Sequence, residues 1–73
     1  MQIYQMKTIL EDHVKYLHGR DGGKQADFSR KSLRNSTIGY YNFSYADLNR
    51  SNLSGTYFHH NNFTGALFTE ANF

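Results

Sequence analysis

The C-terminal two-thirds of the chain place a large apolar residue at every fifth position. From residue 28 to residue 73 these ten positions are all Phe, Leu or Ile. A helix repeats its apolar positions about every 3.6 residues and a half-buried strand every two, so neither explains the pattern. A coil explains it if each five-residue unit forms one short side and one corner, with four sides per turn. We therefore expect a solenoid in which residues twenty apart lie above one another.

The residue two positions before each central residue is expected to point inward too, so it must be small. Three of these residues are not small, namely Lys31, Tyr41 and Asn61. We expect Lys31 to leave the core beside a helix, Tyr41 to turn outward and Asn61 to bond neighbouring backbone. For Tyr41 and Asn61, an alternative explanation is equally good: the coil simply tolerates an irregular repeat at these positions. The positions that follow the rule are Ala26, Ser36, Ala46, Ser51, Thr56, Ala66 and Ala71.

Residues 1–25 predict a short amphipathic helix over residues 8–18, followed by a loop. Thr8 and Glu11 have the spacing of a capping box, in which each side chain bonds a free backbone N–H of the first turn. Glu11 and Lys15 have the i, i+4 spacing of an ion pair on the outer face. The apolar face contains Ile9, Leu10, Val14 and Leu17, and Ile3 and Met6 extend it backward, which leaves the start of the helix open.

The end of this helix and its place in the fold are also predicted. Gly19 is expected to stop the helix in a left-handed conformation, and residues 21–23 to form a turn rather than a nucleotide-binding loop. A solenoid needs covered ends, because each end coil buries only one of its two surfaces. We expect the helix to lay its apolar face over the first coil, with His13 as a partly buried contact.

The rhythm A-(D/N)-(L/F)-x-x, seen in "ADFSR", "ADLNR", "SNLSG", "NNFTG" and "ANF", resembles the pentapeptide-repeat family. The resemblance covers residues 26–73 and implies a mainly β fold: a short right-handed quadrilateral β-helix of about 2.4 coils with an N-terminal capping α-helix. The segment "ILEDHVKYLHGRDGGKQADFS" is similar to a helix-plus-Gly-Gly leader of bacterial and phage members, with Tyr16 where that leader often carries Trp. We expect one structural domain, with residues 1–25 as its cap.

The resemblance also implies a class of function. Most members are non-enzymatic, and some inhibit or protect DNA gyrase, in part as acidic dimers that imitate DNA. We expect a protein-binding module, not an enzyme, that is a small phage or bacterial inhibitor or modulator of a nucleic-acid-handling complex. The net charge of +2 and the short chain speak against DNA imitation. A structural spacer without a specific target is a further alternative.

The amino-acid composition excludes some kinds of site and some cellular locations. The chain has no Cys, which excludes disulfides and cysteine-based catalysis or metal binding. No apolar run reaches membrane-spanning length, so we expect a soluble protein of the cytoplasm, or of the host cytoplasm if it is phage-encoded. No catalytic residues and no cofactor are predicted.

Outward-facing aromatic residues and histidines gather on two adjoining faces of the predicted coil. Exposed Tyr is enriched at interfaces, although stacking for stability alone is the alternative. We expect Tyr40 to stack under His60. We expect no metal site, because neighbouring histidines on an extended side point differently and no other ligand is nearby. The predicted partner-binding residues are Tyr40, Tyr41, Tyr45, Tyr57, His59 and His60.

The sequence predicts two further surfaces that could contact a partner, a basic one and an apolar one. The first surface is basic: we expect Arg30 and Arg50 to form one outward column with Glu70 above them, and Lys31 and Arg34 to lie beside this column. These four cations are a candidate contact for nucleic acid. The alternative, which is more common for such residues, is a solvated face without a partner. The last coil is expected to leave an apolar edge that invites another chain. We expect it to form a two-fold homodimer, with a target protein covering that edge as the alternative. The residues of this dimer end are Phe58, Phe63, Phe68 and Phe73.

Overall fold

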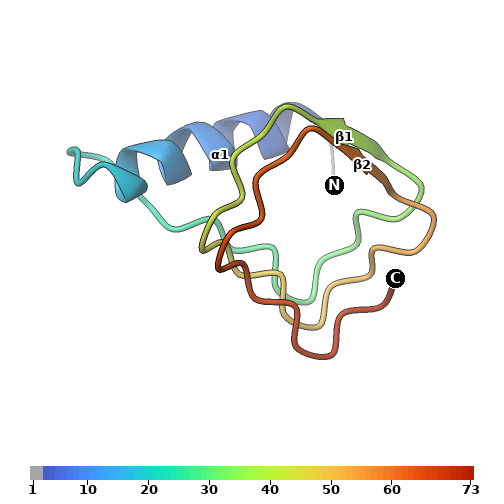
Figure 1. Ribbon diagram of the computed structural model, residues 1–73. Helices are drawn as coiled ribbons and strands as arrows, with labels where there is room; N and C mark the ends of the chain where they lie inside the picture. Colours follow the sequence, from blue (N-terminus) through green and yellow to red (C-terminus); the bar gives the residue numbers. More distant parts are fainter. Residues whose placement is uncertain (1–2) are drawn as a thin grey trace.

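The computed structural model describes residues 3–73 and shows, in that range, one helix followed by a stack of coils (Figure 1). The helix α1 spans Ile3–Leu17, and two short strands follow, β1 at Thr37–Gly39 and β2 at Tyr57–His59. The rest of the repeat region consists of turns and isolated bridges. Successive coils follow nearly the same outline, so each lies directly beside the next (Figure 1).

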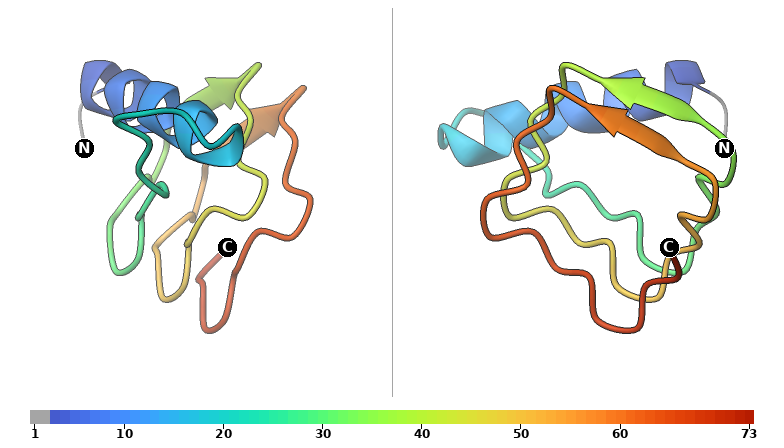
Figure 2. Two further views of the ribbon diagram at one scale, coloured as in Figure 1. Left: turned by 90° about the vertical axis from the view of Figure 1, so that its left-hand side faces the viewer. Right: turned by 45° about the vertical axis from the view of Figure 1, so that its right-hand side comes forward.

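Residues twenty apart pair in parallel along the stack. In β1 and β2, Ile38 lies opposite Phe58 and Gly39 opposite His59. The predicted repeat of twenty residues per coil is confirmed at each of these pairs, and stacking by parallel pairing is the β-helix type of fold (Figure 2). The isolated bridges have the same spacing and are Asp27↔Asp47, Ser32↔Asn52, Asn42↔Asn62, Asp47↔Leu67 and Asn52↔Asn72.

The corners of the coils use left-handed backbone. The fifth residue of every unit from 26–30 to 66–70 has a positive φ, which the third residue of a type II turn requires. Many of these turns are closed by a backbone hydrogen bond, such as that from Ala46 N–H to the Phe43 carbonyl at 2.9 Å. This conformation costs a non-glycine residue about 1–2 kcal/mol, so packing inside the coil must offset it. The non-glycine corners are Arg30, Asn35, Tyr40, Tyr45, Arg50, His60 and Glu70.

The core runs through the middle of the coils. Met6 and Leu10 of α1 join it, together with Ala26 and Ala46 from the small inward positions. The rings of Phe43 and Phe63 stack along one column at a centroid distance of 4.9 Å. The six central residues from the first coils are at most 2% exposed, and they are Phe28, Leu33, Ile38, Phe43, Leu48 and Leu53.

The helix differs from its prediction at the start. It spans Ile3–Leu17 instead of residues 8–18, so Thr8 and Glu11 lie in its interior and do not form a capping box. The physical reason is that Met6, two residues before Thr8, is buried in the core, so the apolar face of the helix already includes residues before Thr8. Lys15 pairs with Asp12 at 3.8 Å and not with Glu11.

The end of the helix is as predicted. Gly19 has a φ of 66°, and Arg20 N–H donates to the Lys15 carbonyl at 2.9 Å while Gly19 N–H donates to the Tyr16 carbonyl at 3.2 Å. These bonds form a Schellman motif, which ends a helix in left-handed backbone. The following turn brings Lys24 N–H to the Asp12 carbonyl at 3.0 Å, and so ties the first coil to the helix.

His13 fastens α1 to the stack. Its side chain is fully buried, more than the partial burial predicted. Ala26 N–H donates to Nδ1 at 2.9 Å, so Nδ1 carries no proton and Nε2 donates to the Ser44 carbonyl at 2.7 Å. One imidazole therefore joins the helix to two coils, and α1 lies beside the first coil at one end of the stack (Figure 2).

Candidate binding surface

Four of the predicted partner-binding side chains contact one another around β2. Tyr40 stacks on His60 at 4.8 Å with nearly parallel rings, which confirms the predicted stacking. Tyr57 stacks on His59 at 5.4 Å, and His59 meets Tyr40 edge to face at 5.2 Å. We name Tyr40, Tyr57, His59 and His60 the aromatic patch. Its role in binding stays a prediction.

The local backbone explains how these four side chains meet. Tyr57 and His59 alternate with the inward Phe58 on β2, so both lie on the outer side of the strand. Tyr40 and His60 are corner residues twenty apart, with φ of 65° and 54°. Gly39 lies opposite His59, and the imidazole occupies the space that a side chain at position 39 would fill. A glycine is therefore required there for the His59 ring to lie against the coil.

The patch is both exposed and internally supported. Tyr40 is 76% exposed and Tyr57 64%, although each ring contacts a histidine. The rings of His59 and His60 are nearly perpendicular and so point differently, as predicted, but their Nδ1 atoms lie only 3.1 Å apart, which the sequence did not predict. The left-handed backbone at His60 accounts for this, because it takes the residue out of the strand alternation that would separate the two rings.

Tyr41 does not belong to the patch. The prediction that it turns outward is wrong, since its side chain is half-buried and packs edge to face on Phe43 at 6.2 Å. The reason is the position of α1: Leu10 and Val14 line the same small hollow and give the ring apolar neighbours. Asn61 behaves as predicted. Its Nδ2 donates to the Ile38 carbonyl at 2.9 Å, and its Oδ1 accepts from Tyr41 N–H at 2.9 Å.

Tyr45 lies at a different corner, against Gly65 of the next coil. With Tyr16, Leu17 and Leu67 it borders a shallow groove of about 550 Å³ between the end of α1 and the coils. Within the described residues, no ring contact joins Tyr45 to the aromatic patch. The six predicted residues thus divide into one cluster of four and two separate positions.

The predicted basic residues do not form one surface. Arg50 pairs with Glu70 at 3.4 Å, which confirms the predicted column and engages one of its two arginines. Arg30 and Arg50 border an open hollow that also contains the carboxylate of Asp47. Lys31 lies elsewhere, beside Ile9 of the helix. Arg34 is exposed.

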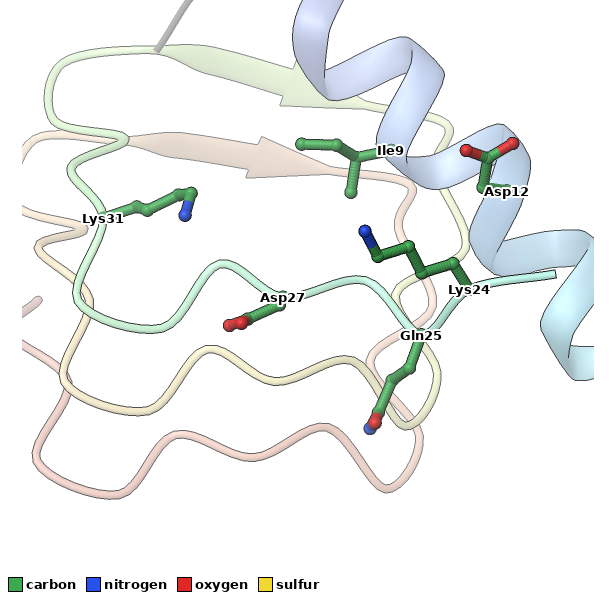
Figure 3. A pocket seen from close by; sticks show the side chains of 6 residues that line it. All are labelled: Ile9, Asp12, Lys24, Gln25, Asp27 and Lys31. Atoms are coloured by element: carbon green, nitrogen blue, oxygen red, sulfur yellow. The ribbon is translucent and has the colours of Figure 1, made fainter. Parts of the chain in front are cut away.

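A hollow of about 310 Å³ lies between α1 and the first coil (Figure 3). Lys31 and Lys24 extend over the coil toward Ile9, as expected for a Lys31 side chain that leaves the core beside the helix. Asp27 lies below them, and the hydroxyl and backbone N–H of Ser29 lower the pKa of its carboxyl, with smaller contributions from the Lys31 and Lys24 ammonium groups. Cations and anions balance here, so the hollow does not select one sign of charge.

In the described part of the chain, no three His, Cys, Asp or Glu side chains gather as metal ligands would. Its one helix is too short and too polar to cross a membrane.

Comparison with known protein families identifies part of the repeat region. Residues 42–73 match the family model described as Pentapeptide repeats, in eight copies. Residues 42–73 therefore belong to the pentapeptide-repeat family. No curated protein and no solved structure matches the chain. The match does not include residues 1–25, so the resemblance of that segment to a leader of pentapeptide-repeat proteins stays a prediction.

The last coil of the pentapeptide repeats is less buried than the first. Phe58, Phe63 and Phe68 are half-buried, whereas Phe73 is 73% exposed. Their rings form a chain of contacts, with centroids 5.1 Å apart for Phe58 and Phe63 and 5.6 Å apart for Phe68 and Phe73. The predicted dimer end is therefore a continuous aromatic edge, and its pairing with a second chain stays a prediction.

Proposed function

We propose that this pentapeptide-repeat protein is a non-enzymatic module that binds another protein through the aromatic patch. The observation that carries the proposal is that the side chains of Tyr40 and Tyr57 are exposed to solvent while a histidine ring stacks on each of them. Tyrosines are enriched among residues that dominate binding energy, and side chains already held by neighbours lose little conformational freedom on binding. The contacts with His59 and His60 supply that support before any partner arrives.

We propose further that the partner is a nucleic-acid-handling protein complex and that the chain is a small phage or bacterial inhibitor or modulator in the cytoplasm. The support is the resemblance to pentapeptide-repeat proteins, some of which inhibit or protect DNA gyrase, and we propose that the coils form the right-handed quadrilateral β-helix of that family. Imitation of DNA is a weaker proposal, because the net charge is +2 and acidic columns are lacking among the described corner residues.

Direct binding of nucleic acid is also weaker. Arg50 is engaged with Glu70, and Lys31 lies beside α1, away from Arg30. Strong phosphate binding needs several free cations along one surface. A second copy of the chain remains the proposed partner of the last coil, through residues 58–73.

The double variant Tyr40→Asn with Tyr57→Thr tests the aromatic patch. Asn tolerates the left-handed corner at position 40, and Thr suits the strand at position 57, so folding is retained. Capture of partner from a bacterial lysate by immobilised protein is expected to fall about tenfold or more, as for loss of dominant interface residues. Quantitative mass spectrometry of the captured proteins measures it.

Tyr45→Asn is the matched control for this experiment. Tyr45 is also an exposed corner tyrosine, with a φ of 61°, but it lies outside the aromatic patch. It should leave capture unchanged. Equal capture by the double variant and the wild type would contradict the proposal, and a large drop in its thermal midpoint would assign the four rings to stability instead.

A further inference from the structure

His59 and His60 have the geometry of a chelate at the centre of the aromatic patch. Their rings lie 5.3 Å apart and nearly perpendicular, and the two Nδ1 atoms are 3.1 Å apart. Two imidazole nitrogens bound to one ion at about 2.0–2.1 Å lie about 2.9 Å apart at a right angle and about 3.3 Å apart at the tetrahedral angle. The observed separation falls between these values, so this distance is compatible with one ion bound to both nitrogens in place of the hydrogen bond that now joins them.

Both rings are held in place by other residues. The His60 ring stacks on Tyr40, and the His59 ring lies between Tyr57 and the edge of Tyr40. Gly39 leaves room for the His59 ring against the coil. The two nitrogens are therefore brought together by the fold, and an ion that replaces the contact between them does not have to order two free side chains.

We propose that His59 and His60 form a two-ligand site for a divalent transition-metal ion. Neutral imidazole suits copper, nickel and zinc, and copper(II) binds nitrogen ligands most tightly in this series. Within the described residues no third His, Cys, Asp or Glu completes a set, so the chain supplies two ligands. The remaining coordination positions face outward, since Tyr40 and His60 are exposed. This site does not depend on the proposed docking of a partner protein.

Titration with copper(II) alone, in a buffer that does not bind the metal, tests the site. Isothermal calorimetry gives the stoichiometry, and tyrosine fluorescence reports proximity, because the chain contains no Trp and copper(II) quenches nearby tyrosines. We expect one ion per chain at this site. Two variants each remove one ligand: His59→Phe keeps an aromatic ring against Gly39, and His60→Asn places at the corner a residue that the chain already uses at Asn35.

Each variant is expected to weaken copper binding by about tenfold or more. Even the loss of a residue that only contacts a metal ligand typically lowers metal affinity by about tenfold or more, and these variants remove a ligand itself. His18→Gln removes a histidine near the end of α1 and should leave the affinity and the quenching unchanged. Binding of equal strength by His60→Asn and the wild type would overturn the proposal, as would the absence of saturable binding to the wild type. Thermal unfolding of His60→Asn, which changes an exposed corner, confirms that any loss is a loss of ligand.

Discussion

At the residue scale, an Asp or Asn in the second position of a unit supports the turn that follows. Asn52 Oδ1 accepts the backbone N–H of Ser54 at 3.0 Å and its hydroxyl at 2.7 Å. Such side chains replace a missing backbone partner and so favour turns. The five-residue pattern alone did not predict this bond, although Ser or Thr recurs two residues after the Asp or Asn in several units. The same bond to the backbone two residues on is made by Asp27, Asn42, Asp47 and Asn62.

The hydrogen bonds from Ser29 to the Asp27 carboxylate predict that the stability of the fold depends on pH. Its pKa is lowered from 3.8, first by the Ser29 hydroxyl and backbone N–H and then by Lys31 and Lys24. A carboxyl whose pKa is lower in the folded state stabilises the fold above its unfolded pKa, and this contribution is lost as the pH falls through the folded pKa. We therefore expect the thermal midpoint of the wild type to decline in acid partly through Asp27.

Asp27→Asn tests this expectation, because Asn occupies the same position at 42, 52 and 62. The variant should keep the bond to Ser29 and lose the titrating group. Its thermal midpoint is expected to decline less than that of the wild type between about pH 5 and pH 2, where a lowered carboxyl titrates. Parallel pH profiles for the two proteins would show that the Asp27 charge does not contribute.

At the element scale, local patterns predicted the end of α1 and missed its start. Gly19 ends the helix through bonds within six residues, which a local reading can detect. The start depends on Met6 and its burial among residues of the distant coils. The spacing of Thr8 and Glu11 was compatible with a capping box, but it was outweighed by this tertiary packing.

His13→Phe tests how α1 is attached to the stack. Phe keeps most of the ring volume but leaves the Ser44 carbonyl and Ala26 N–H without their partners. Each unpaired buried group costs about 1–3 kcal/mol, so we expect the free energy of unfolding to fall by about 2–5 kcal/mol. Urea unfolding followed by circular dichroism measures it. The exposed His18, changed to Phe, serves as the control, and an equal small effect of both variants would mean that the two bonds do not fasten the helix.

At the scale of the whole molecule, the five-residue period predicted the stack and most of its columns. Ile38 with Phe58, Phe43 with Phe63 and Tyr40 with His60 all follow from adding twenty to the residue number. Features that depend on corner backbone or on the placement of α1 did not follow from it. The convergence of His59 and His60 and the inward turn of Tyr41 belong to this second group, because a period does not specify left-handed φ or a helix packed from outside the repeat.

Burial declines along the stack, from the coil beside α1 to the last described coil. Phe43 and Leu48 donate their backbone N–H groups to the next coil, at 2.7 Å and 2.9 Å. Phe63 and Phe68 have no such acceptor within the described residues. Exposed backbone edges of a sheet attract another strand, and here the edge carries an aromatic surface. In the proposed homodimer a second copy would provide a matching edge and matching rings at once, since a two-fold axis makes one patch its own partner.

Sedimentation of the wild type and of Phe73→Asp at micromolar concentration tests this homodimer. Phe73 is 73% exposed in the single chain, so Asp is tolerated there in a monomer. In the dimer the same carboxylate would be buried against an apolar edge, which is costly for an unpaired charge. We expect a dimeric wild type, a monomeric variant and similar circular dichroism for both. Tyr45→Asp places the same charge at an exposed corner away from residues 58–73 and should remain dimeric. A wild type that sediments as a folded monomer would show that the last coil does not pair with its own copy.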